Sequence, residues 1–356
     1  MKNLIRVLLI NQKKIPHYRV SVYNYLSDFL YKEGIELIII SEGINNPEKH
    51  DIYFKHIEIK LTSLKLYRQI KRLKPQIVIY WINPKNLYLI PLLIFLKLQR
   101  IKAIYWGHGT DLYSRKYIRI KSFIYHTQFL LSDAIILYAE HLKKYINKRF
   151  HNKIFIANNT LHLNYDHILK NLDKKDVLNG YNITTNKNII CLGRMQKRKR
   201  IQDLLMAFSM ISRDDTGLIF VGPDDEGILA NVHEKRIYKI GPLYGEEKMK
   251  LIASCDILCI PGAVGLSIVD GFYCGLPLIT EDIYESPEIM YLKDGINGFI
   301  VPKGNVKLLV EKLNLLLNDD ELRKRLSIEA KREINDHGNI VNFCNGFLDT
   351  IKNVIK

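Results

Sequence analysis

Short apolar runs rich in β-branched residues alternate with longer amphipathic runs through the first half of the chain. Strands that are apolar on both faces, separated by segments of helical periodicity, are typical of a parallel sheet covered by helices. The expected strands are Leu4–Ile10, Glu36–Ile40, Ile77–Trp81, Lys102–Tyr105, Ala134–Tyr138 and Lys153–Ile156. The expected helices are Val20–Leu30, Leu64–Leu73, Pro84–Leu98 and Tyr117–Leu131.

The pattern stops in a polar stretch rich in Asn and Lys, about residues 157–186, and then restarts. The second set of expected strands is Asn188–Leu192, Gly217–Val221, Arg236–Ile240, Asp256–Ile260, Leu278–Thr280 and Phe299–Val301. The second set of expected helices is Ile201–Ser212, Glu246–Ala253, Gly265–Tyr273 and Val306–Leu317, followed by a terminal amphipathic helix, Ile340–Ile355.

This restart predicts an α/β protein with two doubly wound, Rossmann-like domains in tandem and a cleft between them. The expected domains are residues 1–165 and 187–338, joined by a linker over 166–186. Residues 339–356 are expected to pack back toward the first domain. In doubly wound sheets ligands bind beyond the carboxyl ends of the strands, so the chemistry is sought there.

Composition places the chain among ordinary globular proteins, because 47% of its 356 residues are hydrophobic and 25% are charged. The formal charge of +16 is unevenly distributed. Residues 1–180 hold 30 Lys and Arg against 13 Asp and Glu, whereas the rest of the chain is near balance. An anionic partner is therefore expected for the first domain, and such an excess suits an anionic membrane surface.

The sequence gives little support to a disulfide-rich, metal-binding, membrane-spanning or nucleic-acid-binding protein. Five cysteines in a long chain are no disulfide framework, and the Cys255–Cys259 pair lacks further ligands at metal-binding spacing. The longest apolar run is about half a membrane span, so we expect a cytoplasmic protein at the inner face of a membrane. No nucleic-acid-binding motif is present, and no nucleic acid partner is expected.

The densest chemical signal is the segment from Pro261 to Thr280, PGAVGLSIVDGFYCGLPLIT. A buried strand precedes it, a helix is expected to begin near Gly265, and backbone amides at a helix start suit phosphate oxygens. Ser267 could donate its hydroxyl, and Asp270 could accept the vicinal hydroxyls of a ribose. The other reading is an ordinary Gly-rich turn. The residues that would bind the donor here are Gly262, Ala263, Val264, Gly265, Leu266, Ser267 and Asp270.

A second cluster follows the strand that ends near Gly193. Arg194 stands at the carboxyl end of that strand and Lys199 comes just before the next helix. Two cations at this position could hold a diphosphate and neutralise charge on a leaving group. The alternative is a solvated basic loop, since three further cations lie in it.

In their order and separation these two clusters resemble the donor domain of family 4-type glycosyltransferases with the GT-B fold. Gly193-Arg194, Lys199, the strand end Gly241-Pro242-Leu243 and the segment Gly262 to Asp270 match the family motifs in order, over residues 188–318. The resemblance implies donor-binding roles for Gly193, Gly241 and Leu243. Two departures stand out: the first glutamate of the family's Glu-x7-Glu segment falls on Gly262, and the second on Asp270.

The first half matches the family more loosely, through Ile15–Arg19 and the Gly107-His108-Gly109 turn. In related enzymes a His at this turn lies near the donor sugar and the reacting carbon, so the resemblance implies a catalytic role for His108. His17, Arg19 and Gly107 are candidates for the acceptor side. Asp111 could orient His108, although capping of the following helix is favoured.

The sequence thus predicts a retaining, metal-independent glycosyltransferase that needs no cofactor. It would move a sugar from a nucleoside-diphosphate sugar, with UDP as the expected nucleotide, to a saccharide or lipid-linked saccharide in bacterial polysaccharide or O-antigen assembly. Two alternatives stay open: a non-catalytic sugar-nucleotide- or polysaccharide-binding subunit, and a nucleotide-sugar epimerase of the same fold.

Overall fold

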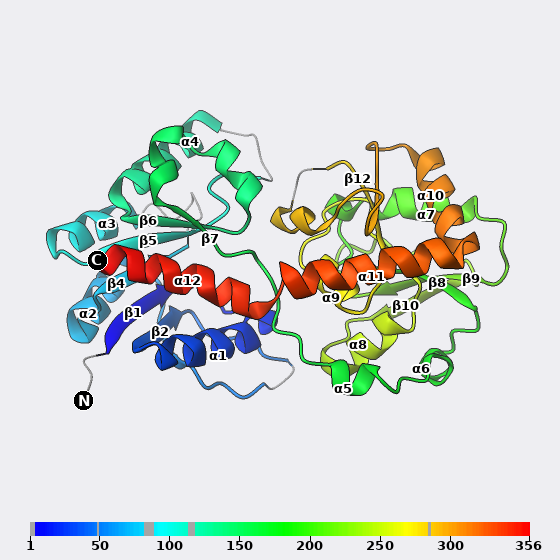
Figure 1. The fold of residues 1–356 in the computed structure, drawn as a ribbon, viewed down its shortest axis with the longest axis horizontal. Helices are drawn as coiled ribbons and strands as arrows, with labels where there is room; N and C mark the ends of the chain where they lie inside the picture. The colour runs from blue at the N-terminus through cyan, green and yellow to red at the C-terminus, as the bar shows by residue number, and fades with distance from the viewer. Residues whose placement is uncertain (1–3, 48–49, 82–88, 113–117, 284–285) are drawn as a thin grey trace. The chain divides into compact units, whose positions relative to one another are not determined.

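The computed structural model describes residues 4–47, 50–81, 89–112, 118–283 and 286–356. The chain divides into two compact units (Figure 1). The first comprises Met1–His162 with Asn339–Lys356, and the second comprises Leu163–Gly338.

The first unit is built on a parallel sheet of seven strands in the order β3-β2-β1-β4-β5-β6-β7. The strands are β1 (Ile5–Ile10), β2 (Ile35–Ser41), β3 (Lys55–Glu58), β4 (Ile77–Tyr80), β5 (Lys102–Gly107), β6 (Ala134–Leu137) and β7 (Ile154–Ile156). The helices are α1 (His17–Lys32), α2 (Ser63–Leu73), α3 (Leu89–Leu98), α4 (Ile118–Leu131) and α12 (Ile340–Ile355), with 3-10 turns η1 (Glu140–Tyr145) and η2 (Lys148–Lys153).

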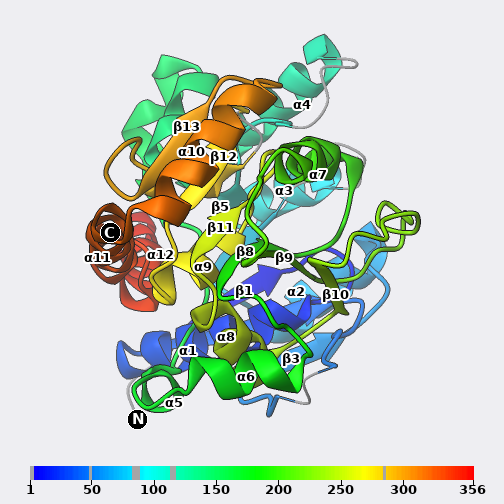
Figure 2. The same ribbon diagram turned by 90° about the vertical axis from the view of Figure 1, so that its right-hand side faces the viewer.

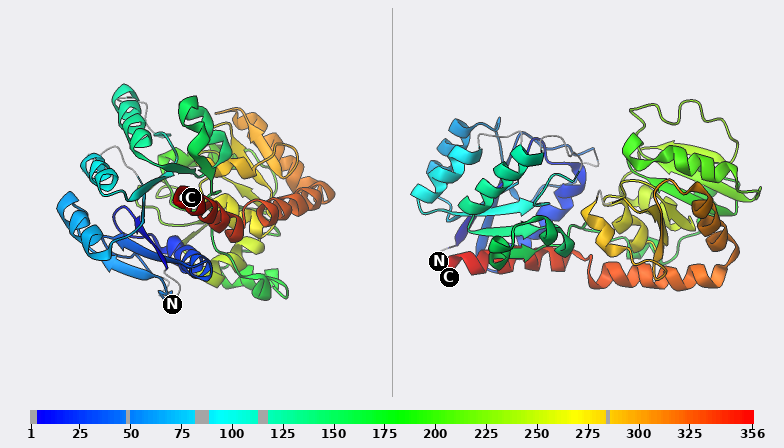
Figure 3. Two further views of the ribbon diagram at one scale, coloured as in Figure 1. Left: turned by 60° about the vertical axis from the view of Figure 1, so that its left-hand side comes forward. Right: turned by 90° about the horizontal axis from the view of Figure 1, so that it is seen from above.

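The helices of the first unit cover both faces of its sheet. The crossover through α1 runs from β1 to β2, whereas those through α3 and α4 run the other way along the sheet. Right-handed crossovers in opposite directions place their helices on opposite faces. Figure 3 accordingly shows α2, α3 and α4 in a row on one side of this sheet and the red helix α12 on the other.

The terminal helix α12 packs on α1, β6 and β7. Asn339 caps its start by accepting a hydrogen bond from the amide of Asn342 at 2.8 Å. A Cβ atom on Gly346 would lie 2.3 Å from the carbonyl oxygen of Ile156, so a glycine is required for this close approach to β7.

The second unit carries a parallel sheet of six strands in the order β10-β9-β8-β11-β12-β13 (Figure 2). The strands are β8 (Lys187–Leu192), β9 (Thr216–Val221), β10 (Ile237–Gly241), β11 (Ile257–Cys259), β12 (Leu278–Glu281) and β13 (Gly298–Val301). The helices are α5 (Asp166–Leu169), α6 (Lys174–Gly180), α7 (Ile201–Ser209), α8 (Gly245–Ala253), α9 (Ser267–Tyr273), α10 (Val306–Asn318) and α11 (Asp320–Asp336), with 3-10 turns η3 (Lys197–Lys199) and η4 (Pro287–Tyr291).

The predicted α/β fold with two parallel, doubly wound sheets is confirmed. One strand and three helices were not predicted: the edge strand β3, the short helices α5 and α6 within the expected linker, and the long helix α11. β3 is short and solvent-facing, and α11 is rich in charged residues, so neither has a strong apolar pattern. The expected helix starts at Pro84 and Tyr117 lie outside the described residues.

Each sheet reverses its strand order once. In the first unit the reversal lies between β1 and β4, and in the second between β8 and β11. At such a point the loops leave the two neighbouring strands in opposite directions and open a crevice, which is where doubly wound sheets bind ligands. Among the described residues, none of the helices is long and apolar enough to span a bilayer.

Candidate functional site

Both predicted clusters of the second unit follow the two strands at its reversal point. The loop with Arg194 and Lys199 leaves β8, and the segment from Pro261 leaves β11. β8 and β11 pair directly, with Ile189 opposite Ile257. The structure therefore brings together two segments that lie about 60 residues apart in the sequence.

The turn after β8 depends on glycine. Gly193 has a φ of +89°, in the left-handed region that other residues rarely adopt. The backbone of Gly222, which follows β9, packs directly against this turn. A Cβ atom on Gly222 would lie 2.2 Å from the Gly193 carbonyl oxygen. Arg194 projects from this turn and is exposed, with its Nε 3.8 Å from a carboxylate oxygen of Asp225. Its guanidinium is therefore accessible to a ligand.

Lys199 is buried, with 5% of its surface exposed. Its Nζ donates a hydrogen bond to the carbonyl oxygen of Ala263 at 3.3 Å. Burial lowers the pKa of the Lys199 amine to about 8; Cys191 opposes this effect, and the positive charge of Arg198 adds to it. A Cβ atom added to Gly193 would lie 3.5 Å from this Nζ and 3.3 Å from Ser267 Oγ. These three residues converge on one spot.

The segment after β11 is fastened to the turn η3 by its backbone. The amides of Gly262 and Ala263 donate to the carbonyl oxygens of Lys199 and Arg198, each at 2.9 Å. A Cβ atom on Gly262 would lie 2.1 Å from the Arg198 carbonyl oxygen. Position 262 therefore has no room for any side chain, and its amide is already used. The amide of Ala263, which was expected to approach a ligand, is therefore used within the protein instead.

A second predicted amide is also bonded within the protein. Gly265 has a φ of +60°, and its amide donates to Ser286 Oγ at 3.1 Å. Among the residues that the structure describes, the amides of Val264, Leu266 and Ser267 have no hydrogen-bond acceptor in the protein. These three are the donors that a phosphate could use. Ser267 Oγ itself donates to the Leu192 carbonyl oxygen at 3.3 Å.

Ser286 and Glu288 were missed by the sequence analysis. Both are buried, and the Ser286 hydroxyl donates to the Glu288 carboxylate while accepting from Gly265. Through the bond to the Gly265 amide, these two residues hold the segment after β11 in its conformation, although they lie outside that segment. The local sequence is a Ser-Pro-Glu run whose proline and glutamate begin η4, and this is the pattern of an ordinary helix start.

We expect Gly262→Ala to destabilise the protein by about 1–3 kcal/mol or more, because overpacking against rigid backbone forces the chain to shift. Gly262→Glu, which would restore the family's glutamate, should be at least as damaging. Chemical denaturation measures both. Gly180→Ala is the matched control, since Gly180 has no positive φ and an open environment. An equal cost at both positions would contradict the steric argument.

Asp270 lies on α9 and is 8% exposed. Its Oδ1 accepts a hydrogen bond from Lys248 Nζ of α8 at 2.9 Å. The predicted carboxylate is therefore present and largely desolvated, but it already has a cation as partner. Gly241 and Leu243 precede α8 at the end of β10 and are half-buried. Gly241 also tethers this end to β9, because its carbonyl oxygen accepts from the Gly222 amide at 2.7 Å.

In the first unit Arg19 is not at a rim, as was expected, but in the interior. It is 5% exposed, and its guanidinium donates to Asn159 Oδ1. The guanidinium carbon lies 5.2 Å from the centre of the Trp106 ring and 5.9 Å from that of Phe343 on α12. Arg19 therefore joins α1 to the aromatic core under α12, and its assignment to the acceptor side is corrected. The cause is the helix α1, which begins at His17 and turns residue 19 inward.

His108 follows β5 and is half-buried, with its ring edge-on to Tyr138 at 4.8 Å between centres. Gly107 before it is buried, and a Cβ atom there would lie 2.7 Å from Tyr105 Oη. The Asp111 carboxylate pairs with Lys121 of α4 at 2.6 Å. His17, the first residue of α1, is half-buried beside Tyr18.

No three His, Cys, Asp or Glu side chains among the described residues are grouped so that they could hold a metal ion. The five cysteines are unpaired thiols.

Known proteins share this fold, and some of them match parts of the sequence. Residues 173–333 match the family model described as glycosyl transferases group 1. The chain is 24% identical over 173 residues to N-acetyl-alpha-D-glucosaminyl L-malate synthase of Bacillus anthracis, a match covering 46% of this chain and 44% of that protein. It is 22% identical over 360 residues to the capsular polysaccharide biosynthesis glycosyltransferase CapM of Staphylococcus aureus, covering 92% and 91%. The crystal structure of Anabaena HepE in complex with UDP-glucose has a TM-score of 0.76 at 14% identity, covering 98% and 99%.

The two doubly wound units make this a GT-B fold. More particularly, residues 173–333 match the model of group 1 glycosyl transferases, and the chain resembles glycosyltransferases of bacterial polysaccharide synthesis. The chain spans less than half the length of the first of these relatives.

Proposed function

We propose that this protein is a retaining, metal-independent glycosyltransferase of bacterial surface-polysaccharide or O-antigen assembly. The donor is a nucleoside-diphosphate sugar, with UDP as the nucleotide, and the acceptor is a saccharide or lipid-linked saccharide. The observation that carries the proposal is the convergence of Lys199, Gly193 and Ser267 where the strand order of the second sheet reverses. The group 1 domain match and the UDP-glucose held by the HepE structure support the same donor class.

Charge neutralisation supports the leaving-group role. Departure of a nucleoside diphosphate leaves negative charge on its terminal phosphate, and preorganised cations there stabilise the transition state. Lys199 is held in place by burial and by the Ala263 carbonyl, whereas Arg194 is free to approach from solvent. Together they could do what a divalent ion does elsewhere. The amides of Val264, Leu266 and Ser267 would add uncharged donors to the phosphates.

The acceptor is assigned to the first unit. His108, Gly107 and Asp111 follow β5, and His17 follows β1, all beyond the carboxyl ends of strands. The charge excess of this half suits an acceptor with an anionic, lipid-linked diphosphate, and hence work at the inner face of a membrane. Retention of configuration is proposed from the resemblance alone, and proton nuclear magnetic resonance of the product's anomeric centre tests it.

The first experiment is calorimetry with UDP, GDP, ADP and CMP, followed by a UDP-release assay with UDP sugars and a saccharide acceptor in EDTA. We expect UDP to bind most tightly and release to depend on the acceptor. Binding without transfer to any acceptor would favour the non-catalytic subunit, and conversion of the donor without acceptor would favour the epimerase. Activity that is lost in EDTA and restored by magnesium or manganese would contradict the metal-free mechanism.

We expect UDP affinity to fall as pH rises above about 8. A bound diphosphate favours protonated Lys199, whose pKa in the free protein is about 8, so binding takes up a proton at higher pH. One linked proton weakens binding by up to about tenfold per pH unit, until the pKa of the complex is reached. The phosphates of UDP are already ionised in this range. Calorimetry at several pH values measures the slope, and Lys199→Met should remove it.

The unliganded protein should behave in the opposite sense. Folding lowers the pKa of Lys199 below its ordinary value, so above pH 8 the unfolded chain binds more protons than the folded one. The contribution of this residue to stability therefore rises with pH between about 8 and the ordinary lysine pKa of about 10.4. For the binding prediction, a wild-type affinity for UDP that does not change as pH rises above about 8 would contradict the role of Lys199 as a phosphate-binding cation.

A further inference from the structure

One long stretch of the first unit is almost without acidic residues. Residues 59–132 hold 14 Lys and Arg but a single acid, Asp111, and its carboxylate is paired with Lys121 at 2.6 Å. This stretch contains α2, α3 and α4, the three helices in contact along one face of the sheet. The three helices themselves hold seven Lys and Arg and no Asp or Glu, so this layer of the fold is positively charged.

The same layer exposes large apolar side chains. On α3, Leu98 is 75% exposed and Ile94 is 48% exposed; on α4, Phe123 is 70% exposed and Ile120 is 61% exposed. Each pair is spaced three or four residues apart, so it lies on one side of its helix. We call these four residues, with the exposed Leu130, the α3–α4 face.

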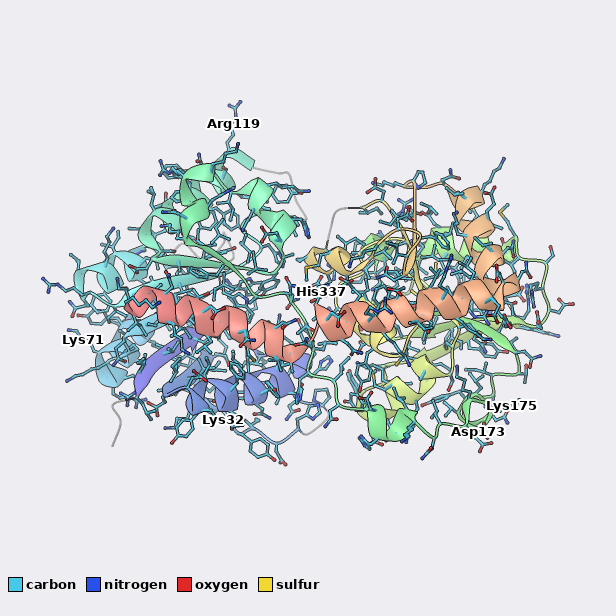
Figure 4. All side chains as sticks on the ribbon, viewed as in Figure 1. Lys32, Lys71, Arg119, Asp173, Lys175 and His337 are labelled. Atoms are coloured by element: carbon cyan, nitrogen blue, oxygen red, sulfur yellow. The ribbon has the colours of Figure 1, made fainter. Side chains whose placement is uncertain are left out.

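Cations border the α3–α4 face. Arg119 lies in the first turn of α4 next to Ile120 and points away from the molecule, and Lys71 projects from α2 (Figure 4). Further exposed cations are Lys65, Arg68 and Arg72 of α2, and Lys97 and Arg100 at the end of α3. Apolar groups surrounded by uncompensated positive charge are complementary to one kind of partner: an apolar layer under an anionic surface.

We propose that the α3–α4 face docks the protein on an anionic phospholipid bilayer. The side chains of Leu98, Phe123 and Ile120 enter the boundary between headgroups and acyl chains, while Arg119 and the cations of α2 and α3 contact lipid phosphates. The use of this docking rests on the proposed function, because it would bring the enzyme to a lipid-linked acceptor. The docking itself needs no nucleotide.

The test is sedimentation of the full chain with phosphatidylcholine vesicles, with and without phosphatidylglycerol. We expect binding only to the anionic vesicles, and weaker binding at high salt. The double variant Leu98→Ser, Phe123→Ser should bind at least about tenfold more weakly, because two apolar side chains no longer leave water. Arg119→Ala should weaken binding about fivefold, the equivalent of about 1 kcal/mol.

Matched controls come from the second unit. Ile328 on α11 is 59% exposed and Lys175 is an exposed cation, so Ile328→Ser and Lys175→Ala should leave vesicle binding unchanged. Equal binding by Leu98→Ser, Phe123→Ser and by Ile328→Ser would overturn the proposal. So would a wild type that binds single-stranded RNA but no vesicles, which would make the basic layer a nucleic-acid surface.

The outcome is separable from that of the proposed function. UDP affinity, measured in solution, should be the same for Leu98→Ser, Phe123→Ser and the wild type. If UDP fails to bind while anionic vesicles do, the enzymatic proposal fails and the docking face stands. If UDP binds normally and vesicles do not, the docking face is wrong and the enzymatic proposal is unaffected.

Discussion

Replacing Lys199 by alanine should reduce turnover about 100–1,000-fold, the cost of losing one preorganised donor to developing charge. The reason is geometric: its amine is buried, held 3.3 Å from the Ala263 carbonyl oxygen, and lies beside Gly193 and Ser267. A buried ammonium that needs no reorganisation stabilises a leaving diphosphate far better than a solvated one does. Steady-state kinetics with a saturating donor measures the effect.

Arg194→Ala should also cut turnover strongly, by about 100-fold, since its exposed guanidinium would complete the pair of cations. Lys197→Ala is the matched control, an exposed cation of the same loop that is expected to leave turnover unchanged. Lys199→Met keeps the volume of the buried side chain and separates charge from packing. Melting temperatures should stay near that of the wild type for Arg194→Ala. Wild-type turnover in both Arg194→Ala and Lys199→Ala would refute the assignment.

The strands of both sheets were predictable because each has an apolar pattern within its own few residues. Runs such as Ile77–Tyr80 and Ile257–Cys259 are apolar on both faces, and only a buried parallel strand satisfies that pattern. The sequence also predicts that both segments follow the carboxyl ends of strands, where doubly wound sheets bind ligands. It does not predict that β8 pairs with β11, because the order of strands in a sheet is set by contacts between distant segments.

The errors concern residues whose environment depends on distant backbone. Gly262 reads as a flexible ligand-binding glycine, but it is a glycine because η3 lies against it. Arg19 reads as a surface cation, but Trp106 and Phe343 close over it from β5 and α12. Neither contact leaves a local trace in the sequence. Ser286 is similar, since its bond to the Gly265 amide joins residues 21 apart through a loop.

Asp270→Ala should weaken UDP binding about tenfold or more. A carboxylate that accepts both hydroxyls of a ribose in a largely dry site contributes about 1–3 kcal/mol, and 1.4 kcal/mol corresponds to a factor of ten. The position is suitable: Asp270 is 8% exposed, on the helix that follows the segment with free amides. Asp270→Asn should be milder, because the amide oxygen still accepts one hydrogen bond. Asp270→Glu should also weaken binding, since one more methylene would overfill a site shaped for aspartate.

The competing explanation is structural, because Asp270 already pairs with Lys248 at 2.9 Å and so ties α9 to α8. Lys248→Met separates the two roles, since it breaks the ion pair and keeps the carboxylate. A purely structural Asp270 predicts that Lys248→Met and Asp270→Ala lower the melting temperature alike and change UDP affinity alike. A ribose contact predicts instead that only the Asp270 variants lose UDP affinity.

The ligand supplies the decisive comparison. Wild-type protein should bind 2′-deoxy-UDP about tenfold more weakly than UDP, because one of the two accepted hydroxyls is gone. Asp270→Ala should bind the two ligands equally, since the acceptor itself has been removed, whereas Lys248→Met should keep the wild-type preference. If Asp270→Ala still binds UDP more tightly than 2′-deoxy-UDP, another group contacts the ribose 2′-hydroxyl. Asp270 would then be left with its bond to Lys248, and the match of its position to the second glutamate of Glu-x7-Glu would lose its functional meaning.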